Sequence, residues 1–263
     1  MLNIQLLRNS KIISIVVLFS IILFSCDKFA NNNKIKTKDG WKEFSVNENG
    51  DSIMRVYRSD GFKKSEVTFK NGFNDGVGYD YYDNGKVHYE IHYKEGYKDG
   101  ETKWFYQNGN IYRITVYEMG KKTGVQKKYY ENGKIKAEIP YKDNHPVKGL
   151  KEYKKDGSLI TGYPRITFKE IDKLAFENKL ILEISLRGKG RKTKYYRIKK
   201  ISGFDHDLSL SAQTKNGKAK IVYKLKPGQS IMEKVRIKAV TNTKMGNPLV
   251  LYKSYNLAAE NRF

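Results

Sequence analysis

YYDNGKVHYEIHYKEGYKDG, residues 81–100, is followed by two close copies of itself, which begin at Phe105 and Tyr129. Each copy starts 24 residues after the one before. The glycine of one Asn-Gly or Asp-Gly pair in each copy keeps the same spacing, at Gly61, Gly85, Gly109, Gly133 and Gly157. Self-similarity at a fixed period is the signature of a repeat array. We therefore expect the middle of the chain to be built from one structural unit used several times.

Each unit reads as a β-hairpin. An Asn-Gly pair between runs of Tyr, Val and Ile is the strongest local hairpin signal, because glycine adopts a positive φ without steric cost. A three-residue loop, Asp83-Asn84-Gly85, sets Tyr81 opposite Val87 and puts glycine in a bulge position. On this register Tyr81, Val87 and Tyr93 share one face. The expected aromatic face comprises Tyr81, Tyr93, Phe105, Tyr117, Tyr129 and Tyr141. The segment from Gly96 to Gly100 is expected to be the loop that returns the chain to the next hairpin.

The motif Y-Y-x-N-G-K followed by Y-x-x-G-x-x-x-G resembles the bacterial variant of the MORN repeat. The resemblance covers roughly Ser52 to Gly162, about four to five units. It implies a single-layer antiparallel ribbon that serves as a scaffold, with no catalytic residues assigned to the repeat. Many bacterial relatives carry an antitoxin label.

The first 25 residues resemble a bacterial lipoprotein signal peptide. Ile12–Phe24 is an apolar run of 13 residues, which has the length of a signal-peptide core and is short for a membrane span. It ends in Leu23-Phe24-Ser25-Cys26, and Cys26 is the single cysteine of the chain. This resembles a lipobox and predicts lipidation at Cys26 and a lipid-anchored place in the bacterial envelope, with the outer membrane favoured. A cleaved signal that leaves a free thiol, or an uncleaved anchor, remain alternatives.

The sequence predicts four parts: a signal peptide at 1–25, a flexible tether at 26–40, hairpin repeats at 41–163, and a further domain at 164–263. The last part loses the 24-residue period and alternates polar and apolar residues in seven short runs. Seven short strands in about a hundred residues favour a β-sandwich. LKPGQSIMEKVRIKAV, residues 225–240, is similar to a stretch of fibronectin type III domains. The predicted fold class is therefore all-β, a hairpin ribbon followed by an immunoglobulin- or fibronectin III-like sandwich.

The charge is concentrated in the last part. Residues 164–263 hold 23 Lys and Arg against 8 Asp and Glu, within a chain of net charge +23. RGKGRKTKYYRIKK, residues 187–200, interleaves basic and aromatic side chains, a pattern that can hold an anionic group. The candidate residues for an anionic ligand are Arg187, Lys189, Arg191, Lys192, Lys194, Tyr195 and Arg197. An envelope protein would meet lipid headgroups or acidic glycans rather than nucleic acid; the alternative is a strand with a lysine-rich solvent face.

No motif of an enzyme is present. The chain contains no HExxH, CxxC or GxSxG. His88 and His92 would lie roughly 13 Å apart on a strand, too far to share a metal ion. Asp205-His206-Asp207 is expected to be a polar loop between strands. The sequence thus predicts a protein without catalytic residues, metal or cofactor.

The predicted function is a lipid-anchored envelope protein that presents its repeat ribbon to a protein or envelope partner. Neutralisation of an exported toxin, as an antitoxin or immunity protein, is an alternative. A role as accessory subunit of an envelope enzyme is another.

Overall fold

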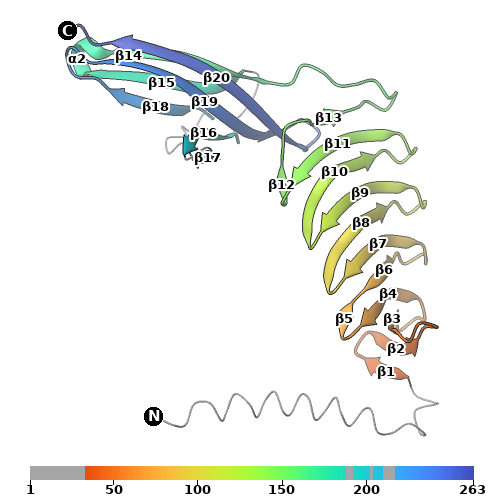
Figure 1. Ribbon diagram of the computed structural model, residues 1–263. Helices are drawn as coiled ribbons and strands as arrows, with labels where there is room; N and C mark the ends of the chain where they lie inside the picture. Colours follow the sequence, from red (N-terminus) through yellow and green to blue (C-terminus); the bar gives the residue numbers. More distant parts are fainter. Residues whose placement is uncertain (1–32, 188–191, 202–203, 210–216) are drawn as a thin grey trace, which may run out of the picture. The chain divides into compact units, whose positions relative to one another are not determined.

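The protein is nearly all β. The computed structural model describes residues 33–187, 192–201, 204–209 and 217–263 (Figure 1). In these residues there is a single short helix, and the chain divides into two compact units, residues up to Tyr97 and Lys98–Phe263. The predicted all-β class is confirmed. None of the helical structure in the described ranges is long and apolar enough to cross a membrane.

The first unit is a run of antiparallel strands in the order β1-β2-β3-β4-β6-β7, with β5 paired to β4. Their bounds are β1 Lys34–Thr37, β2 Gly40–Val46, β3 Ser52–Arg58, β4 Lys63–Lys70, β5 Phe73–Asn74, β6 Gly76–Tyr81 and β7 Val87–Lys94. The predicted tether at 26–40 is wrong in its last part, because Lys34–Thr37 pairs with β2. Lysines on this edge strand protect it against pairing with another chain.

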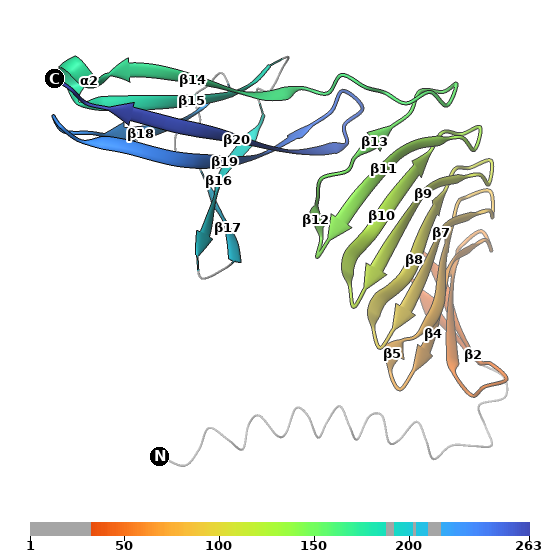
Figure 2. The ribbon, with the colours of Figure 1, turned by 45° about the horizontal axis from the view of Figure 1, so that its top comes forward.

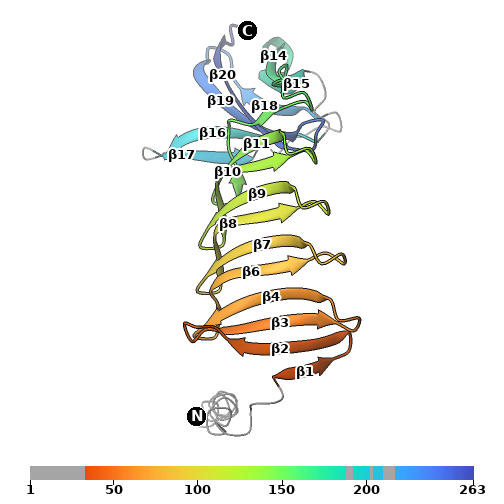
Figure 3. The ribbon, with the colours of Figure 1, turned by 90° about the vertical axis from the view of Figure 1, so that its right-hand side faces the viewer.

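The second unit continues the hairpins before it reaches the sandwich. The strands are β8 Tyr97–Phe105, β9 Ile111–Glu118, β10 Lys121–Tyr129, β11 Ile135–Lys142, β12 His145–Pro146 and β13 Lys151–Glu152. Hairpins β8–β9 and β10–β11 lie side by side, joined by antiparallel pairing of β9 with β10 (Figure 3).

One end of each hairpin is a three-residue loop closed by glycine. The amide of Gly85 donates to the carbonyl of Tyr82 at 2.9 Å, and the amide of Tyr82 donates to the carbonyl of Lys86 at 2.8 Å. Gly85 has a φ of 79° and Gly109 a φ of 97°. This is the type I turn with a glycine bulge that the Asn-Gly pair predicts.

The other end is a two-residue turn. Glu95 and Gly96 have φ values of 50° and 84°, and Met119 and Gly120 have values of 45° and 78°. Two successive positive φ values define a type I′ turn, whose twist matches that of the flanking strands. The predicted loop from Gly96 to Gly100 is therefore wrong, since β8 begins directly after the turn.

A second bulge places the two aromatic columns on opposite faces. Trp104 pairs with Arg113, but its neighbour Phe105 pairs with Ile111, so β9 holds one extra residue beside the loop. Because strand residues alternate between faces, Phe105 points away from Trp104 and from Tyr117, which pairs with Gly100. The same shift occurs at Tyr81 and Tyr129. The prediction of one aromatic face shared by Tyr81, Phe105 and Tyr129 with Tyr93, Tyr117 and Tyr141 is therefore wrong.

Hydrogen bonds at fixed places connect each hairpin to the next. The amide of Gly120 donates to the carbonyl of Lys98 at 2.8 Å, and the amide of Met119 donates to Oδ2 of Asp99 at 3.1 Å. At the opposite end, the hydroxyls of Tyr106 and Tyr130 donate to backbone carbonyls 23 residues further on, at 2.9 and 2.8 Å. The tyrosines that follow Phe105 and Tyr129 thus hydrogen-bond each hairpin to its neighbour.

The last hundred residues form two packed sheets, as predicted (Figure 2). The sheets have the strand orders β14-β15-β18 and β17-β16-β19-β20. The bounds are β14 Arg165–Lys173, α2 Leu174–Glu177, β15 Lys179–Arg187, β16 Lys194–Ile201, β17 Phe204–Ser209, β18 Ala219–Lys224, β19 Ser230–Asn242 and β20 Pro248–Glu260. Asp205–Asp207 lies within β17, so the loop predicted there is wrong.

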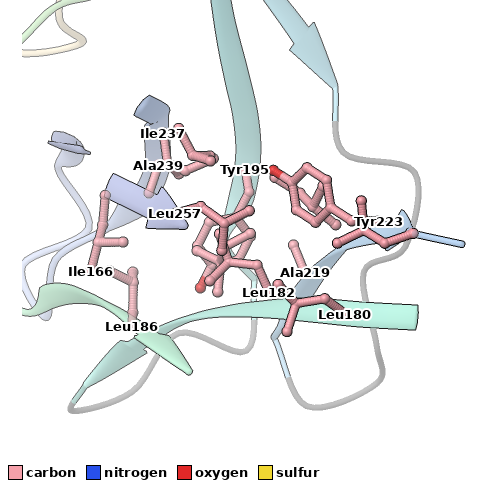
Figure 4. Packing of buried hydrophobic residues seen from close by; sticks show 14 of the residues in the cluster. Ile166, Leu180, Leu182, Leu186, Tyr195, Ala219, Tyr223, Ile237, Ala239 and Leu257 are labelled. Atoms are coloured by element: carbon pink, nitrogen blue, oxygen red, sulfur yellow. The ribbon is translucent and has the colours of Figure 1, made fainter. Parts of the chain in front are cut away.

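The core of the sandwich draws on both sheets. Leu180 and Leu182 project from β15, and Ile237 projects from β19 (Figure 4). These three side chains, together with Ile184 and Val235, have at most 1% of their surface exposed. In contrast, the buried apolar side chains of the described residues begin only at Ala137 in the chain order. The early hairpins therefore rely on their neighbours and on half-buried side chains, whereas the sandwich has a core of its own.

The loop glycines provide a direct test of the turn. Gly109→Val should lower the free energy of unfolding by about 1–3 kcal/mol, because a β-branched residue is strained at positive φ. No heavy atom lies within 4 Å of the position that a Cβ would take, so the loss would come from the backbone and not from a clash. Thermal and denaturant unfolding measure it. Asn108→Asp is the control, since it keeps the side-chain oxygen that accepts from the amide of Asn110. Equal effects of the two substitutions would contradict the turn.

Candidate binding surface

Lysine and tyrosine side chains alternate across the strands of the second unit. Nζ of Lys98 lies 5.6 Å from the ring centre of Tyr117. Lys122 pairs with Tyr117 across β9 and β10, and its Nζ lies 5.5 Å from the ring centre of Tyr141. Because cross-strand partners share a face, these four side chains form one row, which we call the cation–aromatic row. It arises because both residue types recur at 24 residues.

The row is held by cation–π contacts and partial burial. Such contacts contribute about 0.5–1 kcal/mol each where they are exposed. Burial is the main cause that raises the pKa of Tyr117 and of Tyr141 above its usual value. On the same face the guanidinium of Arg113 lies 4.7 Å from the ring of Trp104. Positive groups and flat rings side by side can hold a ligand or partner that combines anionic groups with apolar faces.

The row leads into a cleft of about 500 Å³. Pro146, opposite Tyr141 on β12, lines it together with Val147 from the repeat side, and Val240 lines it from β19. The polar lining is Lys142, Asp143, His145, Tyr196 and Lys238. This volume lies within the range of small-ligand sites, roughly 300–1,000 Å³.

Positive charge predominates in the cleft. Lys238 is the cross-strand partner of Tyr196, and its Nζ lies 5.4 Å from the ring centre. Asp143 forms an ion pair with Lys121 at 3.9 Å. Lys238 and Tyr196 thus add a further cation–aromatic pair, next to the apolar side chains of Pro146, Val147 and Val240.

The residues predicted from the basic segment 187–200 as an anionic-ligand site do not all lie in one place. Lys189 and Arg191 lie outside the described residues. Arg187, Lys192 and Lys194 are exposed. Tyr196, which was not among the predicted site residues, is the member of this segment that reaches the cleft.

Two predicted site residues point into the domain instead. Tyr195 has no exposed surface, and its hydroxyl donates to the carbonyl of Gly217 at 2.9 Å (Figure 4). Arg197 forms an ion pair with Glu233 and lies 5.8 Å from the ring of Tyr223. The prediction that Tyr195 contacts a ligand is therefore wrong, whereas Arg197 is partly exposed and engaged by Glu233. Strand alternation turns every second side chain inward, and the charge pattern alone does not say which ones.

A buried carboxylate joins the last repeat to the sandwich. Glu152, on β13, has 2% of its surface exposed. Its Oε1 accepts from Oγ1 of Thr243 and from Nδ2 of Asn247, both at 2.6 Å. Its Oε2 accepts from the hydroxyl of Tyr163 at 3.3 Å, and Oδ1 of Asn247 accepts from Nζ of Lys128 at 2.7 Å. The predicted domain boundary after residue 163 thus falls inside one compact unit.

Two side chains of this cluster, Tyr163 and Lys128, have shifted pKa values. Burial and then the charge of Glu152 raise the pKa of Tyr163 to about 12. Burial lowers the pKa of Lys128, and the nearby charge of Arg113 adds to this effect. Both shifts follow mainly from burial, which disfavours the charged form of each group.

Among the described residues, the histidines are not gathered with other metal-ligating groups. The ring of His88 lies 4.0 Å from that of Tyr82, and burial lowers its pKa. Across the part of the chain that the structure describes, no three His, Cys, Asp or Glu residues are placed to hold a metal ion.

Three of the hairpins match a known family of repeats. Residues 74–95, 98–119 and 122–143 match the family model described as MORN repeat variant. The match thus covers three consecutive hairpins of the chain. Each match spans one hairpin and ends at the first residue of a two-residue turn. Among curated proteins, no relative matches the chain.

The buried carboxylate can be tested by removal. Glu152→Ala should lower the free energy of unfolding of the second unit by about 2–4 kcal/mol, because buried donors lose a charged acceptor. Thermal unfolding measures the loss. Glu131→Ala is the control, since Glu131 is exposed on the same repeat region. A loss no larger than that of the control would show that Glu152 does not hold the last repeat and the sandwich together.

Proposed function

We propose that this chain acts by binding rather than by catalysis, as a lipid-anchored scaffold whose MORN-type repeats present the cation–aromatic row to a partner in the bacterial envelope. The observation that carries the proposal is the match of three consecutive MORN-type repeats. A repeat array displays the same side chains at a regular spacing, and such surfaces suit extended partners.

The row gives the partner its chemistry. Lys98 and Lys122 supply positive charge, and Tyr117 and Tyr141 supply flat apolar surface beside it. The cleft that follows, with Lys142 and Lys238, would take an anionic group of that partner. An acidic glycan or a protein with acidic and aromatic side chains fits this pattern.

The proposed anchor is an acyl group on Cys26. Its support is the apolar run Ile12–Phe24 and the small Ser25 before the cysteine. Multiple acylation anchors a protein far more firmly than one chain. The anchor would hold the repeats at a membrane surface, where an envelope partner can reach them.

The proposed surface predicts a face-specific loss of partner. Envelope material captured by the wild-type chain should be lost with the double variant Lys98→Ser and Lys122→Ser. Quantitative mass spectrometry of the captured material measures this. The control, Lys127→Ser with Lys134→Ser, removes the same charge from the opposite face and from an exposed loop. If both variants lose or keep the same material, the row is not the binding surface.

If Cys26 is lipidated, removing the cysteine should change how the protein divides between membrane and soluble fractions. Cys26→Ser should leave the protein unprocessed or released from the membrane fraction, because the acyl acceptor is gone. Membrane fractionation and the mass of the N-terminal peptide measure this. A Ser10→Ala variant keeps the cysteine and should remain lipidated. Persistence of Cys26→Ser in the membrane at the processed size would refute the anchor without affecting the scaffold role.

A further inference from the structure

Large apolar side chains are almost fully exposed at one end of the sandwich. Phe176, Met232 and Phe263 have 95%, 89% and 71% of their surface exposed. Phe176 lies in α2, and Met232 lies near the start of β19, where Ser230 pairs with Glu260 at the end of β20. Figures 1 and 2 both show α2 beside the end of the chain. We call this end, residues 174–178, 225–232 and 260–263, the apolar tip.

The tip is rigidly built. Asn261 has no exposed surface, and its Nδ2 donates to Oδ1 of Asn178 at 2.8 Å and to the carbonyl of Leu225 at 2.7 Å. The amide of Leu225 donates to the carbonyl of Asn178 at 2.9 Å. One asparagine thus ties together the three segments of the tip. The exposure of Phe176 is therefore a fixed feature of the fold.

Several backbone amides of the tip have hydrogen-bond partners in the tip or directly beside it. The amide of Asn178 donates to the carbonyl of Leu174 at 3.1 Å, and the amide of Gly228 donates to the carbonyl of Asn261 at 2.7 Å. The amide of Leu174 donates to Oδ1 of Asp172 at 2.8 Å. Entering an apolar medium is costly for unpaired backbone groups, so this internal bonding suits a segment that leaves water.

The segments that carry these apolar side chains have a small excess of basic residues. Residues 172–179, 224–234 and 258–263 contain six Lys and Arg against four Asp and Glu. Glu177 is engaged by Lys173 and Lys179, and these hydrogen bonds lower its pKa. Lys224 and Lys226 are exposed and form no ion pair with a described residue. Their charges are available to phosphate groups outside the protein.

We propose that the apolar tip inserts shallowly into a bilayer that contains anionic lipids. Phe176 and Met232 enter the boundary between headgroups and acyl chains, and Lys224 and Lys226 meet lipid phosphates. Apolar side chains flanked by lysines are the combination that interfacial binding requires. This contact is separate from the proposed anchor at Cys26 and from the cation–aromatic row.

Fluorescence tests the insertion directly. The chain from residue 26 onward, with Cys26→Ser, lacks both the signal segment and the acyl acceptor. It would be mixed with vesicles of phosphatidylglycerol and phosphatidylcholine in equal parts. The tryptophan emission of the Phe176→Trp variant should shift to shorter wavelength when vesicles are added, because the new indole leaves water. Phe62→Trp, at an exposed phenylalanine of the first unit, should not shift.

Vesicle sedimentation tests the energetics. The double variant Phe176→Ser and Met232→Ser should bind the vesicles at least about tenfold more weakly than the parent chain, because it buries less apolar surface in the bilayer. Phe62→Ser should partition as the parent chain does, and equal melting temperatures would confirm that all variants fold.

Two outcomes would overturn the proposal. An unshifted emission of the Phe176→Trp variant, or equal partitioning of all variants, would exclude insertion and leave only adsorption of a basic domain. If the double variant Phe176→Ser and Met232→Ser lost self-association in sedimentation velocity but bound vesicles as the parent chain does, the tip would be a contact between two copies of the chain. Both outcomes are independent of Cys26 and of the captured partner, so they leave the proposed scaffold role unaffected.

Discussion

Each hairpin of the repeat region depends on the next one, because a single hairpin has no second layer against which to bury its side chains. The fixed hydrogen bonds between units meet this constraint. The Gly120 amide reaches the carbonyl of Lys98, and the Tyr106 hydroxyl reaches the carbonyl of Tyr129. A period of 24 residues follows, since every unit must present the same donors and acceptors to its neighbour. The binding surface proposed above is a consequence of the same repetition.

The sandwich solves the burial problem in a different way. Two sheets cover each other, and side chains such as Tyr195 and Leu182 lose all exposed surface. The repeats and the sandwich of the second unit then meet through Glu152, a buried carboxylate whose two oxygens both accept hydrogen bonds. A charge removed from water demands complete hydrogen bonding, and this requirement fixes how β13 and the β19–β20 turn lie. The cleft beside Tyr196 and Lys238 exists because of that junction.

Membrane association would involve two separate parts of the chain if both proposals hold. An acyl group at Cys26 would supply a firm anchor, and the apolar tip would add a weak, lipid-dependent contact. The two differ in physical origin, since one is covalent and the other depends on Phe176, Met232 and flanking lysines. Neither contact uses the cation–aromatic row, which would remain available to an envelope partner.

The sequence by itself determined the period, the glycine-closed loops and the all-β class, because these depend on local backbone preferences that recur along the chain. Seven strands of the sandwich were also visible as alternating runs. The faces of the hairpins were decided only by the tertiary structure, since one extra residue beside each loop turns Phe105 away from Tyr117. The candidate site shows the same division. Charge and aromatic content marked residues 187–200, but only the packing of two sheets showed that Tyr195 is buried and that Tyr196 reaches the cleft. Burial and the joining of distant strands are non-local, so no pattern within one segment can specify them.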